Sequence, residues 1–356
     1  MKNKYKSDCR KFRGDLPCKP HKEYDVHCDG CMHYEPMTGI VLIVKFGAIG
    51  DVIRTTPLLH KIAKEMPDKE IWWVTQYPDI LPSSKIDKIL TLTPENLVLL
   101  EQTEFDIIYG LDKDAYACAL TKKLNSNIKY GFTLINGKPA PINSLAEHKY
   151  LTGLFDDINK ANQKSYLEEI FEICDFKFAG EEYILDCDNS IQWEIPSQGK
   201  PVIGLNTGCG DRWVSRLWKD EYWTELANNL KAQGYFPMFL GGKQENEKNK
   251  YYAEQTGCYY PGTFSLKEFI SLLNQCDVVV SAVTMAMHLA VGLQKKLILM
   301  NNIFNKYEFE LYGRGEIVQP RKECTCFFSP KCKNKEYFCM EHLLPEDVLN
   351  AINSHI

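Results

Sequence analysis

The sequence has no apolar run as long as the roughly 18 residues that a transmembrane helix requires. Its first residues are basic but lack the apolar stretch of a secretory signal peptide. A long basic run is also absent, and the net charge of −5 gives no argument for a nucleic-acid partner. We therefore expect a cytoplasmic protein without a membrane span, for which peripheral membrane contact and a homo-oligomer both stay open.

No short internal repeat is visible, and a chain of 356 residues is long enough for two domains. From Ile40 onward, short apolar runs typical of strands alternate with amphipathic segments typical of helices. A stretch rich in Pro, Ser and Gly at 192–200 separates two such sets. This order predicts an α/β fold of two doubly wound domains with a cleft between them. The predicted segments are 1–38 (cysteine-rich), 39–195 (first domain), 196–342 (second domain) and 343–356 (closing helix).

The pattern also places individual elements. The strands that we expect are Ile40–Val44, Ile71–Thr75, Ile107–Tyr109, Ile128–Phe132, Val202–Leu205, Phe236–Leu240, Asp277–Ser281 and Leu297–Met300. The helices that we expect are Thr55–Lys64, Ala115–Leu124, Tyr166–Cys174, Glu221–Gln233, Leu266–Asn274, Met285–Val291 and Pro345–Asn353. Residues 133–165 are polar and rich in turn signals, so we expect irregular structure there.

A glycine-bearing turn follows the first expected strand. Gly47 and Gly50 end the strand, and a helix opens near Asp51. Backbone N–H groups at such a turn can face an anion, and a side chain there can reach a substrate. A purely structural role for Asp51 as a helix cap is the alternative.

The 14 cysteines are unevenly spread. In a chain without a secretory signal, clusters of cysteines favour metal over disulfides. An N-terminal set is interleaved with His21, His27 and His33, and a polar segment this short cannot build its own core. We predict structural zinc there, with iron also compatible and free surface thiols as the alternative. The ligands of this N-terminal set are Cys9, Cys18, Cys28 and Cys31.

Four ordered stretches, 46–57, 206–223, 240–245 and 283–290, resemble the signatures of glycosyltransferase family 9, the ADP-heptose heptosyltransferases of bacterial surface glycans. The first holds Gly-Asp-Val and Thr-Thr-Pro, and the last matches the family at Thr284 and His288. The resemblance implies a GT-B fold with a final helix that crosses back to the first domain. It implies inverting transfer from an ADP-linked sugar to a hydroxyl of a glycan, such as lipopolysaccharide core, or of a protein.

The resemblance also implies roles for single residues. Asp51, in the acceptor-side domain 39–195, becomes the general base, and Gly47, Ala48 and Gly50 form the acceptor or sugar loop. Enzymes of this type generally need no catalytic metal, and no Asp-x-Asp pair stands in a suitable turn. The donor-binding residues implied in domain 196–342 are Thr207, Gly208, Arg216, Lys219, Gly242, Glu245, Thr284, Met285 and His288.

Three points stay open. Val283 stands where the family has an acid, and Met285 where it has a glycine, so another nucleotide sugar or a non-catalytic metal-bound scaffold remains an alternative. Three tryptophans, at 213, 218 and 223, are interpreted as packing residues rather than adenine-stacking ones. A C-terminal cluster resembles one found in the family, and we expect a metal, disulfides or packed thiols there, with a site shared between both ends as a further option. Its members are Cys324, Cys326, Cys332 and Cys339.

Overall fold

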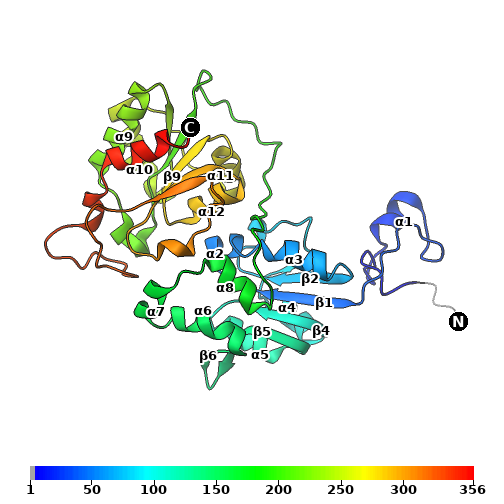
Figure 1. Cartoon of the computed structure of the whole chain (residues 1–356). Helices are drawn as coiled ribbons and strands as arrows, with labels where there is room; N and C mark the ends of the chain where they lie inside the picture. The colour runs from blue at the N-terminus through cyan, green and yellow to red at the C-terminus, as the bar shows by residue number, and fades with distance from the viewer. Residues whose placement is uncertain (1–4) are drawn as a thin grey trace. The chain divides into compact units, whose positions relative to one another are not determined.

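The computed structural model describes residues 5–356, which divide into two compact units (Figure 1). Unit 1 comprises residues 5–48, Pro57–Tyr150 and Ile170–Lys177. Unit 2 comprises Ile49–Thr56, Leu151–Glu169 and Phe178–Ile356. The chain therefore passes between the units more than once, and residues 49–56 belong with the C-terminal half.

Unit 1 contains a six-stranded sheet of order β3-β2-β1-β4-β5-β6. Neighbouring strands are parallel except for the antiparallel β5–β6 pair. The central strand, β1, is an unbroken apolar run from Ile40 to Val44, as expected for a parallel strand covered on both faces. The strands are β1 (Gly39–Val44), β2 (Lys69–Val74), β3 (Lys88–Leu90), β4 (Phe105–Gly110), β5 (Ser126–Ile135) and β6 (Lys138–Pro141).

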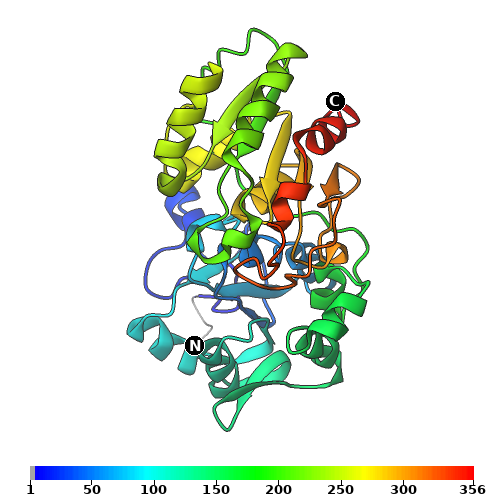
Figure 2. The same ribbon diagram turned by 90° about the vertical axis from the view of Figure 1, so that its left-hand side faces the viewer.

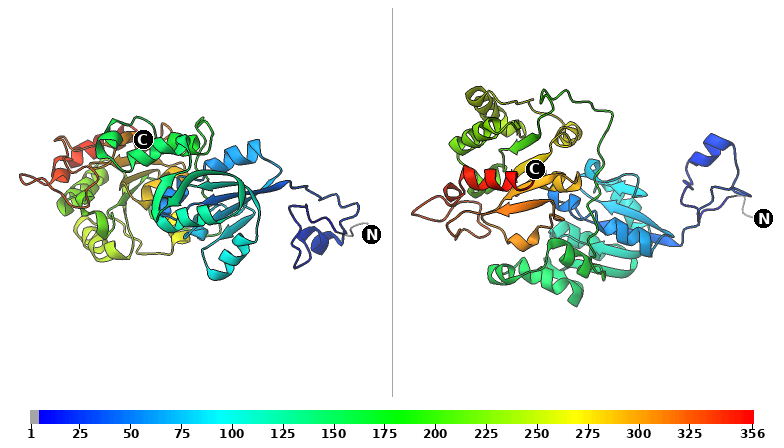
Figure 3. Two further views of the ribbon diagram at one scale, coloured as in Figure 1. Left: turned by 90° about the horizontal axis from the view of Figure 1, so that it is seen from below. Right: turned by 45° about the horizontal axis from the view of Figure 1, so that its top comes forward.

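Helices cover this sheet, and alternate strand residues face opposite sides. Leu42 and Val44 of β1 pack with Leu100 of α4 and Leu120 of α5 in one core cluster. The short α1 lies in the N-terminal segment, beyond the start of β1 (Figure 3). The helices between or next to these strands in the sequence are α1 (Lys19–Tyr24), α3 (Leu58–Glu65), α4 (Pro94–Glu101), α5 (Ala115–Lys123) and α8 (Tyr166–Ile173).

Unit 2 contains a fully parallel five-stranded sheet of order β11-β10-β9-β7-β8. Its strands are β7 (Val202–Asn206), β8 (Phe236–Leu240), β9 (Val278–Ala282), β10 (Lys296–Met300) and β11 (Gly315–Val318). Its helices include α2 (Ile49–Ile53), α7 (Asp156–Ala161), α9 (Asp220–Ala232), α10 (Asn246–Thr256), α11 (Leu266–Leu273), α12 (Met285–Gly292) and α13 (Pro345–Asn353), and α6 (Glu147–Thr152) ends in it.

One face of the unit 2 sheet carries a large core cluster. Val278 and Val280 of β9 pack there with Leu226 of α9 and Tyr252 of α10, two helices that lie side by side along the sheet (Figure 2). Helices α11 and α12 pack together, and α12 also packs on β9 and β10. Trp218 and Trp223 are buried in this cluster, which confirms their interpretation as packing residues.

The structure confirms the α/β class with parallel sheets and every strand that the sequence predicted. The expectation of irregular structure at 133–165 is wrong, because β6, α6 and α7 lie within it. The pattern also missed the short strands β3 and β11. Helix α13 packs against α9, β10 and β11 inside unit 2, and the crossing of this helix to the first domain stays a prediction. Within residues 5–356, no helix is long and apolar enough to cross a membrane.

Candidate active site

A buried charged pair anchors the loop that follows β1. Lys45 Nζ lies 2.6 Å from Asp112 Oδ1, and both side chains are almost inaccessible to water. The second oxygen, Oδ2, accepts hydrogen bonds from the backbone N–H of Phe46 at 2.6 Å and of Gly47 at 3.2 Å. Because a buried carboxylate must be paired, these bonds fix where the loop leaves the sheet.

Asp51 lies in the first turn of α2 and is held by Arg54. The guanidinium Nε and one terminal nitrogen of Arg54 approach the same oxygen of Asp51, at 2.9 and 2.7 Å. The other terminal nitrogen donates to Glu308 Oε1 at 2.8 Å, and the guanidinium stacks on Tyr166 at 3.5 Å from the ring centre. Burial acts to lower the pKa of Arg54, but the charges of Asp51 and Glu308 outweigh burial and raise it. The cluster therefore carries a permanent cation between two acids.

His288 lies on α12, directly against the backbone of α2. A Cβ atom on Gly50 would fall 2.4 Å from His288 Cδ2, so only glycine permits this contact. The ring is stacked on Tyr183, and its Nδ1 has no hydrogen-bond partner among the described residues. Burial and the nearby Arg54 charge lower the pKa of His288 to about 3, so the ring is neutral at physiological pH.

The predicted donor residues Thr207, Gly208 and Glu245 meet at the carboxyl ends of β7 and β8. A Cβ atom on Gly208 would collide with the Glu245 side chain, which also accepts a hydrogen bond from Gly242 N–H at 2.9 Å. Thr207 Oγ1 donates to Asn249 at 2.6 Å. Lys248 Nζ donates to the Thr207 carbonyl at 3.2 Å and places a cation beside this turn.

Thr284 lies at the carboxyl end of the neighbouring strand β9 and caps α12. Its hydroxyl accepts a hydrogen bond from Ala286 N–H at 3.2 Å and lies 3.0 Å from Ser281 Oγ. Asn206, the last residue of β7, donates to the same hydroxyl at 3.4 Å. Met285 begins the helix and is half-buried. Ends of adjacent parallel strands are where such folds bind nucleotides.

The two predicted diphosphate cations lie in different surroundings. Arg216 is 7% exposed, and its guanidinium donates to the Cys209 carbonyl at 2.8 Å. Burial lowers the pKa of Arg216. Lys219 is half-exposed and pairs with Glu341 at 3.1 Å. Neither contact tests donor binding, so both roles stay predictions.

The C-terminal cysteines converge in the described part of the chain. Three sulfur–sulfur distances are 3.6 Å (Cys326–Cys332), 3.8 Å (Cys326–Cys339) and 3.7 Å (Cys332–Cys339). Cys324 also lies with Cys326 and Cys339 in a group whose sulfur atoms are within 4.8 Å of one another. The one-residue spacing between Cys324 and Cys326 therefore does not keep Cys324 out of the cluster.

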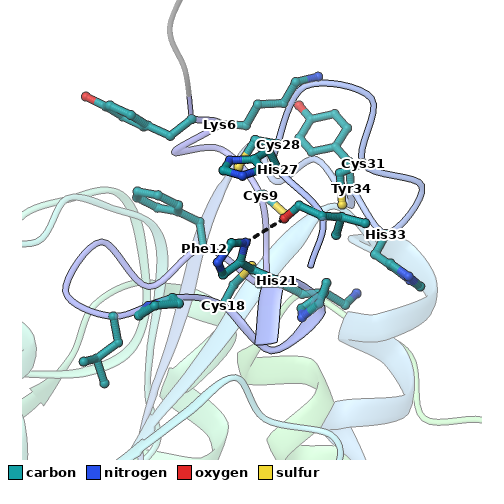
Figure 4. Close-up of a pocket in the computed structure, with 16 residues that line it drawn as sticks. Lys6, Cys9, Phe12, Cys18, His21, His27, Cys28, Cys31, His33 and Tyr34 are labelled. Carbon is teal, nitrogen blue, oxygen red and sulfur yellow. Dashed lines mark hydrogen bonds between the residues drawn. The ribbon is translucent and has the colours of Figure 1, made fainter. Parts of the chain in front are cut away.

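The N-terminal cysteines are arranged differently. Cys9, Cys18, Cys28 and Cys31 line a cavity of about 210 Å³ together with His21 and other residues (Figure 4). No ligand set within 4.8 Å forms among them, whereas the C-terminal thiols do form one in the part of the chain described. The close thiol cluster of this protein is thus C-terminal, which corrects the emphasis that the sequence placed on the N-terminal set.

Two residues of the Asp51 cluster were missed from the sequence. Arg54 lies three residues after Asp51, a spacing that places both side chains on one side of a helix, so this pair could have been found. Glu308 is 254 residues from Arg54 and carries no local signal.

Comparison with known proteins identifies the family of this chain. The family described as glycosyltransferase family 9 (heptosyltransferase) matches residues 99–337, more than half of the chain. The chain belongs to glycosyltransferase family 9. It is accordingly a glycosyltransferase, and this family membership argues against the non-catalytic scaffold. No curated protein sequence matches it significantly.

Solved structures share the fold at low sequence identity. A family 9 glycosyltransferase from Veillonella parvula is 15% identical, with a TM-score of 0.66 over 90% of this chain and 97% of the other. E. coli heptosyltransferase WaaC with ADP-2-deoxy-2-fluoro heptose is 16% identical, with a TM-score of 0.60 over 89% and 100%. The iron-containing dodecameric glycosyltransferase TibC of enterotoxigenic E. coli is 14% identical, with a TM-score of 0.55 over 89% and 76%.

Proposed function

We propose that this family 9 enzyme is an inverting glycosyltransferase of the hexosyl or heptosyl type, in a GT-B arrangement. It transfers a sugar, with heptose from ADP-heptose preferred, to a hydroxyl group of a bacterial surface glycan or protein in the cytoplasm. The observation that carries the proposal is the Asp51 carboxylate fixed by Arg54 beside the neutral His288. The solved complex of WaaC with an ADP-linked heptose supports an ADP-linked donor.

Asp51 acts as the base in this proposal. Its carboxylate takes the proton of the acceptor hydroxyl while that oxygen bonds to the anomeric carbon of the donor sugar. The bond from this carbon to the diphosphate breaks, and its electron pair leaves with ADP. Arg54 fixes the direction in which the carboxylate points, so the base does not have to be ordered during the reaction. Gly47, Ala48 and Gly50 bring backbone close to the sugar.

The donor is held at the carboxyl ends of β7, β8 and β9. Backbone N–H groups after Thr207 and at the start of α12 face the departing diphosphate, and Arg216 and Lys219 are proposed to supply charge. Lys248, whose ammonium group contacts the Thr207 carbonyl, is a third cation at this place. Gly242, Glu245, Met285 and His288 complete the donor site.

Replacement of the base tests the proposal. Asp51→Asn keeps the shape of the side chain but cannot accept the proton, so kcat should fall by about 10²–10⁴-fold. Binding of ADP, followed by calorimetry, should change little because the diphosphate is held elsewhere. Asp157→Asn, at an exposed acid of α7, is the matched control and should leave both quantities unchanged. A kcat in Asp51→Asn within a few-fold of the native value would rule out the base role.

Val283 favours a second candidate, a glycosyltransferase that uses another nucleotide sugar. The half-buried valine next to Thr284 cannot make the polar contact of the acid that the family has there. Melting temperatures measured with ADP-, GDP- and UDP-sugars distinguish the two, because a ligand present at 100 times its Kd stabilises the fold by about 2.7 kcal/mol. Stabilisation by a GDP- or UDP-sugar without any effect of ADP-sugars would favour this second candidate.

We also propose that the C-terminal thiols bind a structural metal ion, either zinc or iron. Four sulfurs around one ion at about 2.3 Å stand about 3.8 Å apart. The thiols of Cys326, Cys332 and Cys339 have this spacing, and Cys324 lies within 4.8 Å of two of them. Burial acts to raise the pKa of Cys326, but N–H groups of Lys333 and Asn334 outweigh it and lower that pKa to about 7. A thiolate is therefore accessible at neutral pH, which metal binding requires.

The same structural role for zinc or iron is proposed for the N-terminal cysteines. TibC is an iron-containing dodecamer, and this supports iron as the alternative to zinc and a homo-oligomer as the assembly to test here. None of these ions takes part in the proposed sugar transfer.

A further inference from the structure

The N-terminal segment has almost no core of its own. Among residues 5–38, Pro20 alone is buried, and Tyr5, Leu16, Tyr24 and Met32 are more than half exposed. Yet the segment follows a defined path, with an isolated β-bridge between Cys9 and Pro36. Apolar burial cannot supply the free energy that ordering about 30 residues costs, so another interaction must.

The cysteines of this segment share one local geometry. Each of their carbonyl groups accepts a hydrogen bond from a backbone N–H three or four residues further on, so each cysteine opens a turn. Their side chains surround the cavity of about 210 Å³ in Figure 4. The imidazole of His21 faces His27 edge-on at 5.3 Å, and its Nδ1 is 2.9 Å from the Val26 carbonyl, which leaves Nε2 as the nitrogen able to bind a metal.

Arg10, next to Cys9, joins this segment to the sheet of unit 1. One of its terminal nitrogens donates to Asp87 at 2.5 Å, and the other donates to the carbonyls of Pro67 and Lys69, each at 3.0 Å. Its backbone N–H donates to the Glu35 carbonyl at 2.9 Å. Lys69 begins β2 and Asp87 directly precedes β3, so Arg10 binds the amino ends of two neighbouring strands.

We propose that a divalent metal ion that prefers thiolate ligands, zinc or ferrous iron, draws the turns at Cys9, Cys18, Cys28 and Cys31 together and thereby fixes Arg10 as a clamp on the amino ends of β2 and β3. The metal stabilises the turn that carries Arg10, and Arg10 in turn stabilises the sheet edge. The inference rests on the N-terminal metal proposed above and is independent of the sugar-transfer proposal.

The position of the clamp indicates a structural and not a catalytic ion. Arg10 binds where strands of unit 1 begin, whereas the loop at 46–50 follows the end of β1. Because the strands are parallel, their amino ends and their carboxyl ends lie on opposite sides of the sheet. Loss of the ion should therefore affect the stability of unit 1 before it affects chemistry.

Metal content of the purified full chain tests the ion. Zinc and iron are counted by mass spectrometry in the native protein, in Cys28→Ser, in Cys326→Ser and in the double variant. The two sets bind separately, so each single variant should lose about one equivalent and the double variant about two. Cys258→Ser, at a half-buried thiol outside both sets, is the matched control and should lose none. Full metal content in Cys28→Ser overturns the proposal.

A double-mutant cycle tests the clamp. Cys28→Ser and Arg10→Gln should each lower the melting temperature, by about 2–4 °C or more. The double variant should melt no lower than the less stable single variant, because both changes release the same contacts. Additive shifts would overturn the coupling. Should Cys28→Ser not fold, trypsin cleavage after Arg13 and Lys22 in metal-depleted native chain should slow on adding Zn²⁺, and an unchanged rate counts against the proposal.

Discussion

Arg54 joins two carboxylates from distant parts of the chain. Removing its charge in Arg54→Gln leaves Asp51 and Glu308 facing each other without a cation, so we expect the free energy of unfolding to fall by about 3–5 kcal/mol. Arg54→Lys keeps the charge but loses the contact of two nitrogens with one Asp51 oxygen, and kcat should fall about tenfold at unchanged ADP affinity.

Urea unfolding and steady-state kinetics measure these two effects. The combined variant Arg54→Gln/Glu308→Gln should be more stable than Arg54→Gln alone, because it removes one of the two opposed acids. An Arg54→Gln protein as stable as the native one would contradict the role given to this cluster.

His288 predicts a pH dependence of stability. Its pKa is about 3 in the fold and 6.5 in its ordinary state, so the unfolded chain binds a proton below pH 6.5 that the folded chain does not. Stability is thus fully present above pH 6.5 and falls toward pH 3, by about 1.3 kcal/mol between pH 7 and 5.5 from this group. Arg54 and Asp51 are the charged groups that face the ring.

His288→Gln should remove this contribution, and urea unfolding at the two pH values measures it. His60→Gln, at an exposed histidine, is the control and should keep the native pH dependence. Equal pH slopes in the native protein and His288→Gln would show that the ring is not held neutral.

Some residues of the candidate site belong to local sequence motifs, and others are brought there only by tertiary contacts. Asp51, Thr284 and His288 lie in local motifs whose turn or helix spacing the sequence displays, so these could be named in advance. The Asp51–Arg54 contact follows from helical spacing, since the two residues are three apart. Glu308 and Lys248 reach the site through tertiary packing, and no pattern of neighbouring residues predicts such a contact.

The segment from Cys324 to Cys339 depends on the metal proposed for it. Cys326 and Cys339 are buried with Ile303 in a small cluster that Trp213 and Phe304 border. Cys326→Ser should lose about one metal equivalent and lower the melting temperature, because a buried serine cannot replace a thiolate ligand. Cys187→Ser is the control, and metal analysis with calorimetry checks both. Unchanged metal content would show that these are packed thiols.

Strands were predicted better than the segments between them. Central strands such as β1 and β9 are buried along most of their length and consist mainly of apolar residues, and that signal is strong. The short strands β3 and β11 have few residues to display a pattern. Helices α6 and α7 lie in a polar stretch with little apolar periodicity, because α6 buries only Thr152 and α7 buries no residue.

Two separate cores predict how the whole molecule unfolds. Each sheet is buried in its own cluster of side chains, one around β1 and one around β9. Calorimetry should therefore resolve two overlapping transitions. ADP should raise the transition of unit 2, and loss of the N-terminal metal should lower that of unit 1. A single transition that both treatments shift equally would show that the units unfold as one.

The assignment of residues 49–56 and 151–169 to unit 2 has a consequence for recombining family members. A chimera cut once near residue 196 would pair α2 of one parent with α12 of the other. Gly50 of one parent would then pack against the α12 of the other, at a contact that leaves no room for a Cβ atom. A chimera that exchanges the C-terminal half should fold only when residues 49–56 and 151–169 are taken from the same parent as that half.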